Sequence, residues 1–314
     1  MRPGEREAEL RAGVLTGLTA SPKRLQPKWN YDERGSALFE EITRLPEYYL
    51  TRRESEILRD RAGQIASTSG AETLVELGAG TSEKTRLLID ALSEAGTLRC
   101  FVPFDVSAET LRASSETLAA EYPELMVHGV VGDFERDLGR LPRDGRRLLV
   151  FLGSTIGNLD PSRRRAFLAS VAATLKTGES FLLGADLVKD VARLEAAYND
   201  SEGVTPKFSR NILRVLNAEL GANFDPELFE HVATFDPVEE WIDIRLRSLS
   251  DQTVTVRELD LSVHFARGEE LRTEISAKFR RERLEAELRA AGLAPTRWWT
   301  DAAGDFGVSL STRL

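Results

Sequence analysis

The sequence predicts an α/β fold, in which a Rossmann-like sheet is interrupted by a second, inserted α+β unit. Short strands alternate with helices from Thr73 to Asp186, and such alternation is typical of βαβ units. The strands are apolar at nearly every position, as in Arg147–Leu152, which indicates parallel strands buried on both faces. After Asp190 a period-two alternation replaces this rhythm, and the βαβ pattern returns only at Phe279. The chain is therefore expected to leave its main sheet, build a separate unit and come back.

Residues 1–70 are predicted to be helical and polar, with one aromatic-rich segment. Apolar residues have helical spacing in Glu5–Leu18 and again in Arg53–Ala66. The segment between these two helices is dense in aromatic residues, which are Trp29, Tyr31, Phe39, Tyr48 and Tyr49. We expect this N-terminal part to form a packed cap.

The α/β part is predicted to begin with five strands and to end with two. The first five are Thr73–Leu77, Leu98–Val106, Leu125–Val131, Arg147–Leu152 and Ser180–Asp186. The helices among them are one that follows a glycine loop after Leu77, then Ala108–Tyr122 and Pro161–Leu175. The C-terminal elements are a helix, Glu282–Ala291, and two strands, Thr296–Thr300 and Phe306–Thr312. These last strands are expected to close the sheet.

The inserted part is predicted to contain two helices and an antiparallel meander. The helices are Val191–Tyr198 and Phe208–Leu220, and the meander lies within Phe229–Phe265. The expected domains are residues 1–60, residues 61–190 with 279–314, and residues 191–278. A ligand site between the sheet and such a second part is the default expectation.

The composition of the chain excludes some classes of binding partner. The chain has 314 residues, with 42 Lys and Arg against 51 Asp and Glu, so its formal charge is −9. This acidic balance argues against nucleic acid or an anionic membrane as the main partner. The charged N-terminus lacks the apolar core of a signal peptide, and no apolar run approaches the roughly 20 residues that span a bilayer. We expect a monomer that acts on a small molecule.

Cysteine and histidine usage argues against a metal or disulfide chemistry. The single cysteine, Cys100, excludes an internal disulfide and a cysteine-cluster metal site, and it fits a reducing cytoplasm. The three histidines are isolated in the sequence, without metal-ligand spacing; they are His128, His231 and His264. We expect them to be structural or exposed, and we expect no metal.

The string VELGAG is the most informative local motif. The first strand ends in a carboxylate, Glu76, and the glycines Gly78 and Gly80 follow before a helix. Glycines allow a sharp turn and the close approach of a ligand to the backbone. A complete dinucleotide fingerprint needs a third glycine where this chain has Glu83, so a pyrophosphate cradle is disfavoured. The pattern E-x-G-x-G resembles instead the S-adenosylmethionine (SAM) loop of class I methyltransferases.

Acidic residues at the next two strand ends support SAM as the cofactor. Asp105 ends the second strand, where a carboxylate can accept both ribose hydroxyls. Asp133 and Phe134 end the third strand, where the acid can accept the exocyclic amine of adenine and the ring can pack on the base. A capping role could explain one such acid, but it explains poorly three acids at successive strand ends beside the glycines.

Eight strings together resemble one family, the histidine-specific Nα-methyltransferases of ergothioneine biosynthesis. They occur in the family's order from about Leu15 to the end of the chain: PKWNYDERGSALFEEITRLPEYYLTRRE, LVELGAGTSEKTRLL, FVPFDVS, GDFE, FLGSTIGNL, GADLVKD, TEISAKF and WWTDAAGDFGVSL. The resemblance implies a class I methyltransferase sheet with an inserted substrate-binding domain and an N-terminal segment packed over the active site. It also implies trimethylation of the L-histidine α-amine to hercynine, with SAM as the methyl donor.

The family's functional positions carry over one by one. Those implied for SAM are Gly78, Lys84, Asp105, Asp133 and Phe134, beside the loop glycine Gly80. Lys84, expected in the first turn of the helix after the loop, can reach the cofactor carboxylate. Those implied for the amino-acid substrate are Tyr48, Asn158, Tyr198, Glu274 and Ser276, with the aromatic residues Tyr31 and Phe39 lining the same pocket.

The residue types suit an amino acid with an imidazole side chain. Asn158 can accept from an α-ammonium and donate to a carboxylate, and Tyr198 can donate to the α-carboxylate. Glu274 can accept from a ring N–H, and Ser276 can bind the other ring nitrogen. These two residues are two positions apart, so on a strand they face the same side. Asn158 and Tyr31 are the expected catalytic residues; either the Tyr31 hydroxyl or water takes the proton of the amine.

Three other functions compete with this interpretation. The first is a methyltransferase of the same family that acts on another aromatic amino acid, such as tryptophan or tyrosine. It is favoured by Asn30, where relatives often carry an aromatic, and by Ile244, where a relative has methionine beside the imidazole. Glu274 argues for histidine, because an indole has a single ring N–H. A nicotinamide-dependent oxidoreductase is disfavoured by the incomplete glycine motif, and a non-catalytic SAM-binding module by the intact polar pocket.

Overall fold

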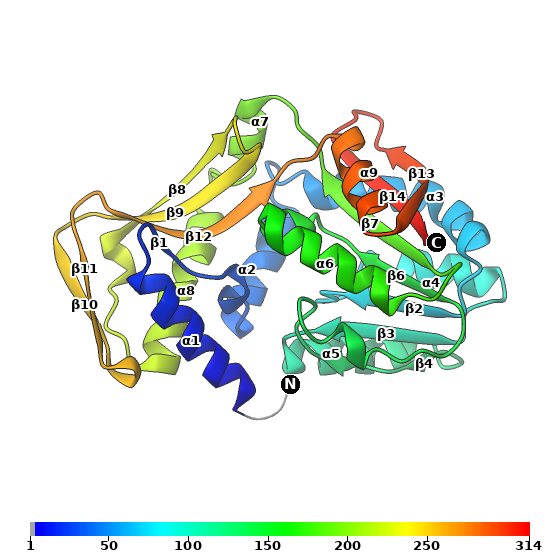
Figure 1. Ribbon diagram of the computed structural model, residues 1–314, viewed down its shortest axis with the longest axis horizontal. Coiled ribbons are helices and arrows are strands. Elements are labelled where there is room, and N and C mark those ends of the chain that lie inside the picture. Colours follow the sequence, from blue (N-terminus) through cyan, green and yellow to red (C-terminus); the bar gives the residue numbers. More distant parts are fainter. Residues whose placement is uncertain (1–3) are drawn as a thin grey trace. The chain divides into compact units, whose positions relative to one another are not determined.

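The computed structural model describes residues 4–314, which form two compact units (Figure 1). The core unit comprises Leu50–Val188 and Lys278–Leu314, and the insert unit comprises the described residues up to Tyr49 together with Lys189–Ala277. The first boundary therefore lies at residue 49 rather than at the expected 60. The reason is that α3 (Leu50–Ser69) is one continuous helix, which packs on α4 and β14 of the core unit.

A mostly parallel sheet forms the centre of the core unit. Its strands, in spatial order, are β13 (Leu293–Thr300), β14 (Phe306–Arg313), β7 (Ser180–Asp186), β6 (Arg147–Phe151), β2 (Thr73–Leu77), β3 (Cys100–Asp105) and β4 (Met126–Val127). The strands from β7 to β4 are parallel, whereas β14 runs antiparallel to β7 and β13 antiparallel to β14. This arrangement confirms the predicted fold class, a Rossmann-like methyltransferase sheet that the C-terminal strands close.

The third predicted strand is interrupted. The expected strand Leu125–Val131 is present as two short pieces, β4 (Met126–Val127) and β5 (Val130–Val131), and both pair with β3. Gly129 lies at the break, where a Cβ atom would be only 3.4 Å from Leu111 Cγ of helix α5 (Ala108–Glu121). The helix therefore approaches the backbone closely at the point where the strand loses its regular pairing.

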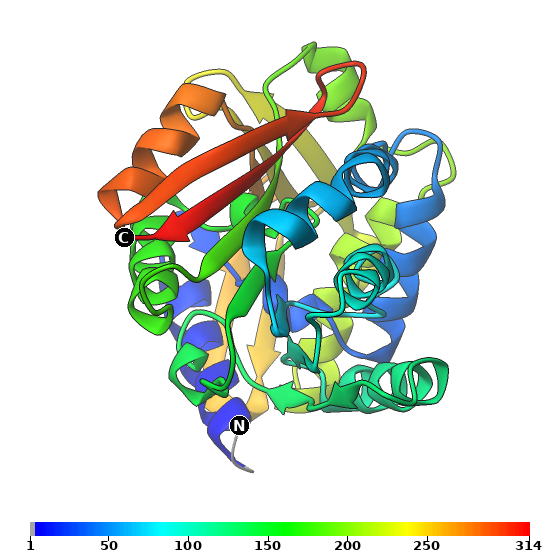
Figure 2. The same ribbon diagram turned by 90° about the vertical axis from the view of Figure 1, so that its right-hand side faces the viewer.

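Helices cover both faces of this sheet. They are α3 (Leu50–Ser69), α4 (Arg86–Glu94), α5 (Ala108–Glu121), α6 (Pro161–Thr174) and α9 (Arg281–Ala290), with 3₁₀ turns η2 (Leu138–Arg140) and η3 (Thr155–Asn158). Figure 2 shows α3, α4 and α5 on one side and α6 and α9 on the other. Strands β2, β6 and β7 are accordingly buried at every position. Within residues 4–314 no helix has the length and hydropathy to cross a membrane.

A buried ion pair fixes the edge of the sheet at which the parallel strands begin. Arg147, the first residue of β6, is fully buried, and its Nη2 atom lies 2.6 Å from Glu179 Oε2. Glu179 precedes β7 and also accepts from the backbone N–H of Lys176 at 2.7 Å. These donors hold the pKa of the Glu179 carboxyl below its ordinary value despite its burial.

The insert unit contains a four-stranded sheet and a separate hairpin. Its helical elements are α1 (Glu5–Thr19), η1 (Pro27–Asn30), α2 (Glu33–Arg44), α7 (Val191–Ala196), α8 (Val204–Leu220), η4 (Pro226–Leu228) and η5 (Arg257–Leu259). Its strands are β1 (Lys23–Arg24), β8 (Phe229–Asp236), β9 (Trp241–Ser248), β10 (Gln252–Val256), β11 (Leu261–Phe265) and β12 (Glu270–Ala277).

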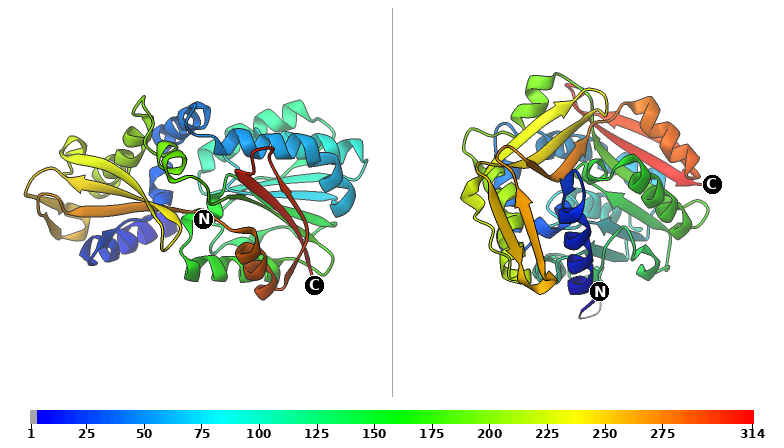
Figure 3. Two further views of the ribbon diagram at one scale, coloured as in Figure 1. Left: turned by 90° about the horizontal axis from the view of Figure 1, so that it is seen from above. Right: turned by 60° about the vertical axis from the view of Figure 1, so that its left-hand side comes forward.

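The single meander predicted over Phe229–Phe265 is wrong in its pairing. β8 and β9 pair as expected, but β9 next pairs with β12, so the sheet order is β1-β12-β9-β8. β10 and β11 pair with each other as a separate hairpin, drawn in orange in Figure 3. The alternation of each strand was correctly located, but it does not specify which edge a neighbouring strand will take.

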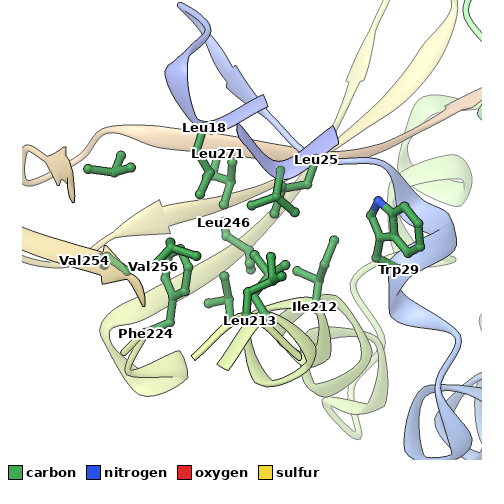
Figure 4. Packing of buried hydrophobic residues seen from close by; sticks show 14 of the residues in the cluster. Leu18, Leu25, Trp29, Ile212, Leu213, Phe224, Leu246, Val254, Val256 and Leu271 are labelled. Atoms are coloured by element: carbon green, nitrogen blue, oxygen red, sulfur yellow. The ribbon is translucent and has the colours of Figure 1, made fainter. Parts of the chain in front are cut away.

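An apolar cluster joins the two sheets of the insert unit to its helices (Figure 4). Leu18 of α1, Leu213 of α8 and Leu246 of β9 are buried in it, together with Val256 of the hairpin. Trp29 of η1 is also part of the cluster. Helical and strand segments from both ends of the insert unit therefore share one core, which explains why the N-terminal residues belong to this unit.

We predict that Glu179→Gln lowers the free energy of unfolding by about 3–5 kcal/mol, because it leaves the buried Arg147 guanidinium without a counter-ion. Chemical denaturation measures this change. The matched control is Glu121→Gln, whose pair with Arg86 is partly exposed and should contribute less than about 1 kcal/mol. Equal losses in the two variants would contradict the importance of burial.

Candidate functional site

The glycine loop follows β2 and leaves its backbone accessible. Gly78 and Gly80 have φ angles of 70° and 50°, which side-chain-bearing residues rarely adopt, and a Cβ atom at either would meet nothing within 4 Å. The N–H groups of Gly78 and Ala79 donate to the Phe104 carbonyl at 2.8 and 3.1 Å, so the loop is tied to β3. The loop thus combines a fixed backbone with open space above its glycines.

Helix α4 begins later than predicted. Its first residue is Arg86, and Lys84 lies in the preceding turn rather than in the first helical turn. The Lys84 ammonium forms an ion pair with Glu54 of α3, a residue that the sequence analysis did not single out. The sequence feature that could have identified Glu54 is its acidic side chain on the apolar side of an amphipathic helix.

Asp105 holds the loop as well as facing its open side. Its Oδ2 atom accepts from the Gly80 N–H at 3.0 Å, and its Oδ1 atom accepts from the Ser107 N–H at 2.9 Å. Burial raises the pKa of the carboxyl, and the backbone donors partly oppose this shift. Each carboxylate oxygen has two acceptor sites, so each can still accept one hydroxyl. The half-buried side chain therefore fits the predicted role of binding two ribose hydroxyls.

Glu76 supports the loop from the buried side. Its carboxyl is buried and accepts from the Ser82 hydroxyl at 2.7 Å and from the Thr85 hydroxyl. Burial raises its pKa to about 7, while the two hydroxyls oppose the shift. The acidic position of the E-x-G-x-G motif is thus an internal brace that ties the end of β2 to the residues before α4.

Asp133 and Phe134 follow β5 at the same edge of the sheet. Asp133 is buried, and its Oδ1 atom accepts from the Glu135 N–H at 2.9 Å. The Phe134 ring makes edge contacts with Phe151 and Phe167, at centroid distances of 4.9 and 5.6 Å, and remains half-exposed. A fixed, half-exposed ring beside a carboxylate suits an adenine base.

These core-unit residues fit SAM as a group. The open glycine backbone, the Asp105 carboxylate at the end of β3 and the Asp133–Phe134 pair after β5 lie at successive strand ends. Because the carboxyl ends of parallel strands share one edge, this is the edge at which open α/β sheets bind their ligands. The carboxylates can accept hydrogen bonds from hydroxyls and an amine, and the Phe134 ring offers an aromatic face to a base.

Asn158 ends the η3 turn, in the loop that connects β6 to α6, and is half-buried. Near its start the loop contains two residues of left-handed conformation, Gly153 and Ser154, with φ angles of 74° and 57°. The Ser154 hydroxyl accepts from the Asp186 N–H at 2.9 Å, so the loop is anchored to β7. A non-glycine residue held at positive φ costs energy that the surrounding contacts must supply.

The insert unit brings together the predicted aromatic residues. Tyr31 and Phe39 make an edge contact at 5.7 Å, Phe39 lies 6.3 Å from Tyr48, and Tyr48 lies 6.1 Å from Tyr198. Phe208 of α8 joins them, at 5.5 Å from Tyr31 and 6.0 Å from Phe39. The sequence analysis missed Phe208, because it marked the start of a predicted helix and carried no motif.

Glu274 and Ser276 lie on one strand, as predicted. Both belong to β12, where Glu274 is half-buried and Ser276 is buried. The Ser276 hydroxyl lies 2.7 Å from the Tyr198 hydroxyl. Ile244 of β9 is the cross-strand partner of Glu274, so the two side chains share a face of the sheet.

One predicted structural histidine supports this group. His231 Nε2 lies 2.9 Å from the Tyr198 carbonyl, and burial lowers the pKa of the imidazole. Within the described part of the chain, no group of three or more His, Cys, Asp or Glu side chains is placed to hold a metal ion.

We predict that the free energy of unfolding of wild type falls, relative to that of a Glu76→Gln variant, as pH rises. The folded protein keeps the Glu76 proton up to about pH 7, whereas the unfolded chain loses it near 4.5, so wild type loses stability between these values. The variant cannot titrate and retains an acceptor for the two hydroxyls. The free energy of unfolding of the variant minus that of wild type should increase by on the order of 2 kcal/mol between about pH 5 and pH 8. Urea denaturation at both pH values tests this; a pH-independent difference would contradict it.

Comparison with known proteins shows the family to which the chain belongs. The profile of the family "Histidine-specific methyltransferase, SAM-dependent" matches residues 10–313. The histidine N-alpha-methyltransferases of Mycolicibacterium smegmatis and Mycobacterium tuberculosis are 57% and 56% identical over 304 residues, which cover 97% of this chain and 95% of each relative. The 4-dimethylallyltryptophan N-methyltransferase of Claviceps purpurea is 30% identical over 244 residues, which cover 74% of this chain and 70% of that protein. The chain therefore belongs to the family of SAM-dependent, histidine-specific methyltransferases.

Proposed function

We propose that the protein trimethylates the α-amine of L-histidine to hercynine, the reaction of ergothioneine biosynthesis, with SAM as methyl donor. The observation that carries the proposal is the polar group of the insert unit: Glu274 and Ser276 share β12, and Ser276 contacts the Tyr198 hydroxyl. The high identity to two histidine N-alpha-methyltransferases supports it. We expect the enzyme to act as a monomer in the cytoplasm, in keeping with its single cysteine and acidic charge.

The core unit supplies the residues for SAM. Asp105 would accept the ribose hydroxyls, while the Gly78–Gly80 backbone accommodates the methionine part. Asp133 and Phe134 would hold the adenine, and Lys84 would bind the carboxylate. When bound, SAM supplies a methyl group that its sulfonium already activates, so the protein's main task is alignment.

The chain must present a neutral amine to that methyl group. The Asn158 amide can accept from the amine and donate to the substrate carboxylate, which fixes the orientation of the reacting nitrogen. Burial among neutral groups lowers the pKa of an ammonium, and the proton passes either directly to water or to the Tyr31 hydroxyl, which releases its own proton to water. Aromatic faces of Tyr31 and Phe39, which contact each other, suit an ammonium that gains methyl groups.

The side chain of the substrate is recognised by β12. Glu274 would accept from one ring N–H, and Ser276 would bind the other nitrogen. Tyr198, positioned by Ser276 and His231, would donate to the α-carboxylate beside Tyr48. A site built to pair polar ring atoms rejects ligands that leave its groups unpaired.

A second candidate is Nα-methylation of another aromatic amino acid, such as tryptophan or tyrosine. The similarity to the Claviceps purpurea enzyme and the aliphatic Ile244 opposite Glu274 favour it. Calorimetry against a panel of amino acids, with S-adenosylhomocysteine present, separates the two candidates. Mass spectrometry of the reaction with SAM then identifies how many methyl groups the preferred amino acid receives. Tighter binding and faster turnover of tryptophan than of histidine would refute the histidine proposal.

We predict that Asp105→Ala weakens the binding of S-adenosylhomocysteine at least about tenfold, because two charge-assisted hydrogen bonds are lost and the Gly80 N–H loses its acceptor. Isothermal titration calorimetry measures the affinity. Glu109→Ala, in the exposed first turn of α5, is the control and should leave the affinity unchanged. An unchanged affinity in Asp105→Ala would remove the ribose assignment.

We predict that Glu274→Ala changes substrate preference. A buried ring N–H would lose its acceptor, at a cost of about 1–3 kcal/mol, so histidine turnover at low concentration should fall at least about tenfold. Tryptophan should gain relative to histidine, because the pocket becomes larger and neutral. A competition assay with both amino acids measures the ratio, and S-adenosylhomocysteine affinity should hardly change. If the ratio of histidine to tryptophan turnover is the same in wild type and variant, Glu274 does not recognise the side chain of the substrate.

A further inference from the structure

Glu54 is a buried carboxylate with no place in the function described so far. It lies in the second turn of α3, and its side chain is fully buried. Removing a carboxylate from water is costly unless charged and hydrogen-bonding partners compensate it. The identity of those partners therefore indicates what this residue does.

The partners of Glu54 come from two functional loops of the core unit. The backbone N–H of Gly153 lies 2.8 Å from Oε1 and 2.9 Å from Oε2. The Lys84 ammonium forms an ion pair with Oε2. Gly153 lies near the start of the loop that carries Asn158, and Lys84 belongs to the loop that contains the glycines Gly78 and Gly80.

The sheet is built to admit this side chain. Gly184 lies inside β7, and a Cβ atom there would be 1.9 Å from Glu54 Oε1. Glycine in the interior of a strand is unfavourable in itself, and it often marks a close approach of another group. The absence of a side chain at Gly184 thus gives the carboxylate its space against the strand.

We propose that Glu54 is a positioning residue for methyl transfer. It holds the Lys84 ammonium where the carboxylate of SAM binds, and it fixes Gly153, near the start of the loop that presents Asn158 to the amine. The inference rests on the proposed function, and it adds a residue that touches neither reactant.

The physical reason lies in the flexibility of lysine. A lysine ammonium sits on a flexible four-carbon stem and has three donors. Glu54 engages one donor and orders the stem, so that less conformational entropy is lost when a ligand carboxylate binds the others. The same carboxylate accepts a hydrogen bond from the Gly153 N–H, and one group therefore determines the positions of both loops.

The test separates the amino-acid part of the cofactor from the nucleoside part. Glu54→Gln keeps an oxygen for the Gly153 N–H, but its NH₂ group must then face Lys84, and the ion pair is lost. We expect S-adenosylhomocysteine, which has the carboxylate, to bind about tenfold more weakly. Binding of 5′-methylthioadenosine, which lacks the amino-acid part, should stay within about twofold of wild type. Calorimetry without histidine measures both affinities.

Glu179→Gln is the matched control, because it removes another buried carboxylate at the opposite end of β6. It should lower the thermal midpoint without changing the ratio of the two affinities. A ratio in Glu54→Gln that is unchanged, or that shifts toward S-adenosylhomocysteine, overturns the proposal. If Glu54→Gln does not fold, the same criteria apply to Glu54→Asp, which keeps the charge but withdraws it from Lys84.

A second measurement tests the contact with Gly153. Glu54→Ala removes the acceptor that Glu54→Gln retains, so hydrogen exchange of the peptide that spans Gly153 should be faster in the alanine variant only. Equal exchange in the two variants would overturn this half of the proposal.

The failure of the proposed function gives a different result. If histidine is not the substrate, these binding and exchange measurements are unaffected, because no amino acid is present. If wild type does not bind S-adenosylhomocysteine, the cofactor assignment is wrong for reasons unrelated to Glu54.

Discussion

Carboxylates that accept backbone and side-chain donors hold together the edge of the sheet where the parallel strands end. Glu76 braces the end of β2, Asp105 ties the glycine loop to β3, and Glu54 reaches the loop after β6. Parallel strands bring their carboxyl ends to one edge, where the chain leaves the regular pairing of the sheet. The carboxylates add hydrogen bonds to the loops at that edge. The same residues therefore stabilise the fold and determine the shape of the glycine loop.

The inserted segment leaves and re-enters the core unit at a reinforced point. Asp186 and Lys278 are fully buried and form an ion pair at 2.9 Å. The backbone continues this contact, because the Phe279 N–H donates to the Asp186 carbonyl at 2.8 Å and the Val188 N–H donates to the Phe279 carbonyl at 3.1 Å. The outgoing and returning chain segments are thus fastened to each other inside the core unit. A long insertion can then be accommodated without disturbing the pairing of β7 with β14.

The proposed function places substrate choice on few side chains. Glu274, Ser276 and the facing Ile244 lie on two adjacent strands, and the register of those strands decides that they share one face. Under the proposed function, the aromatic residues would supply a surface that any planar side chain can use, whereas the polar pair would distinguish an imidazole from an indole. A change on one strand would then alter the preferred amino acid while the core unit stays the same.

The sequence by itself determined the elements and the motifs that depend on neighbouring residues. Strands such as Thr73–Leu77 and Ser180–Asp186 were predicted to the residue, because a strand buried on both faces is mostly apolar. The glycine loop and the acids after the strands were found because their spacing is local. Only the tertiary structure decided the pairing of β9 with β12, the place of Phe208 among the aromatic rings, and the contact of Glu54 with Lys84. Each joins residues more than twenty positions apart in the chain, as in the 23-residue separation of the paired Arg247 and Glu270 and the 30-residue separation of Glu54 and Lys84. Local periodicity carries no information about which distant partner a buried group will meet.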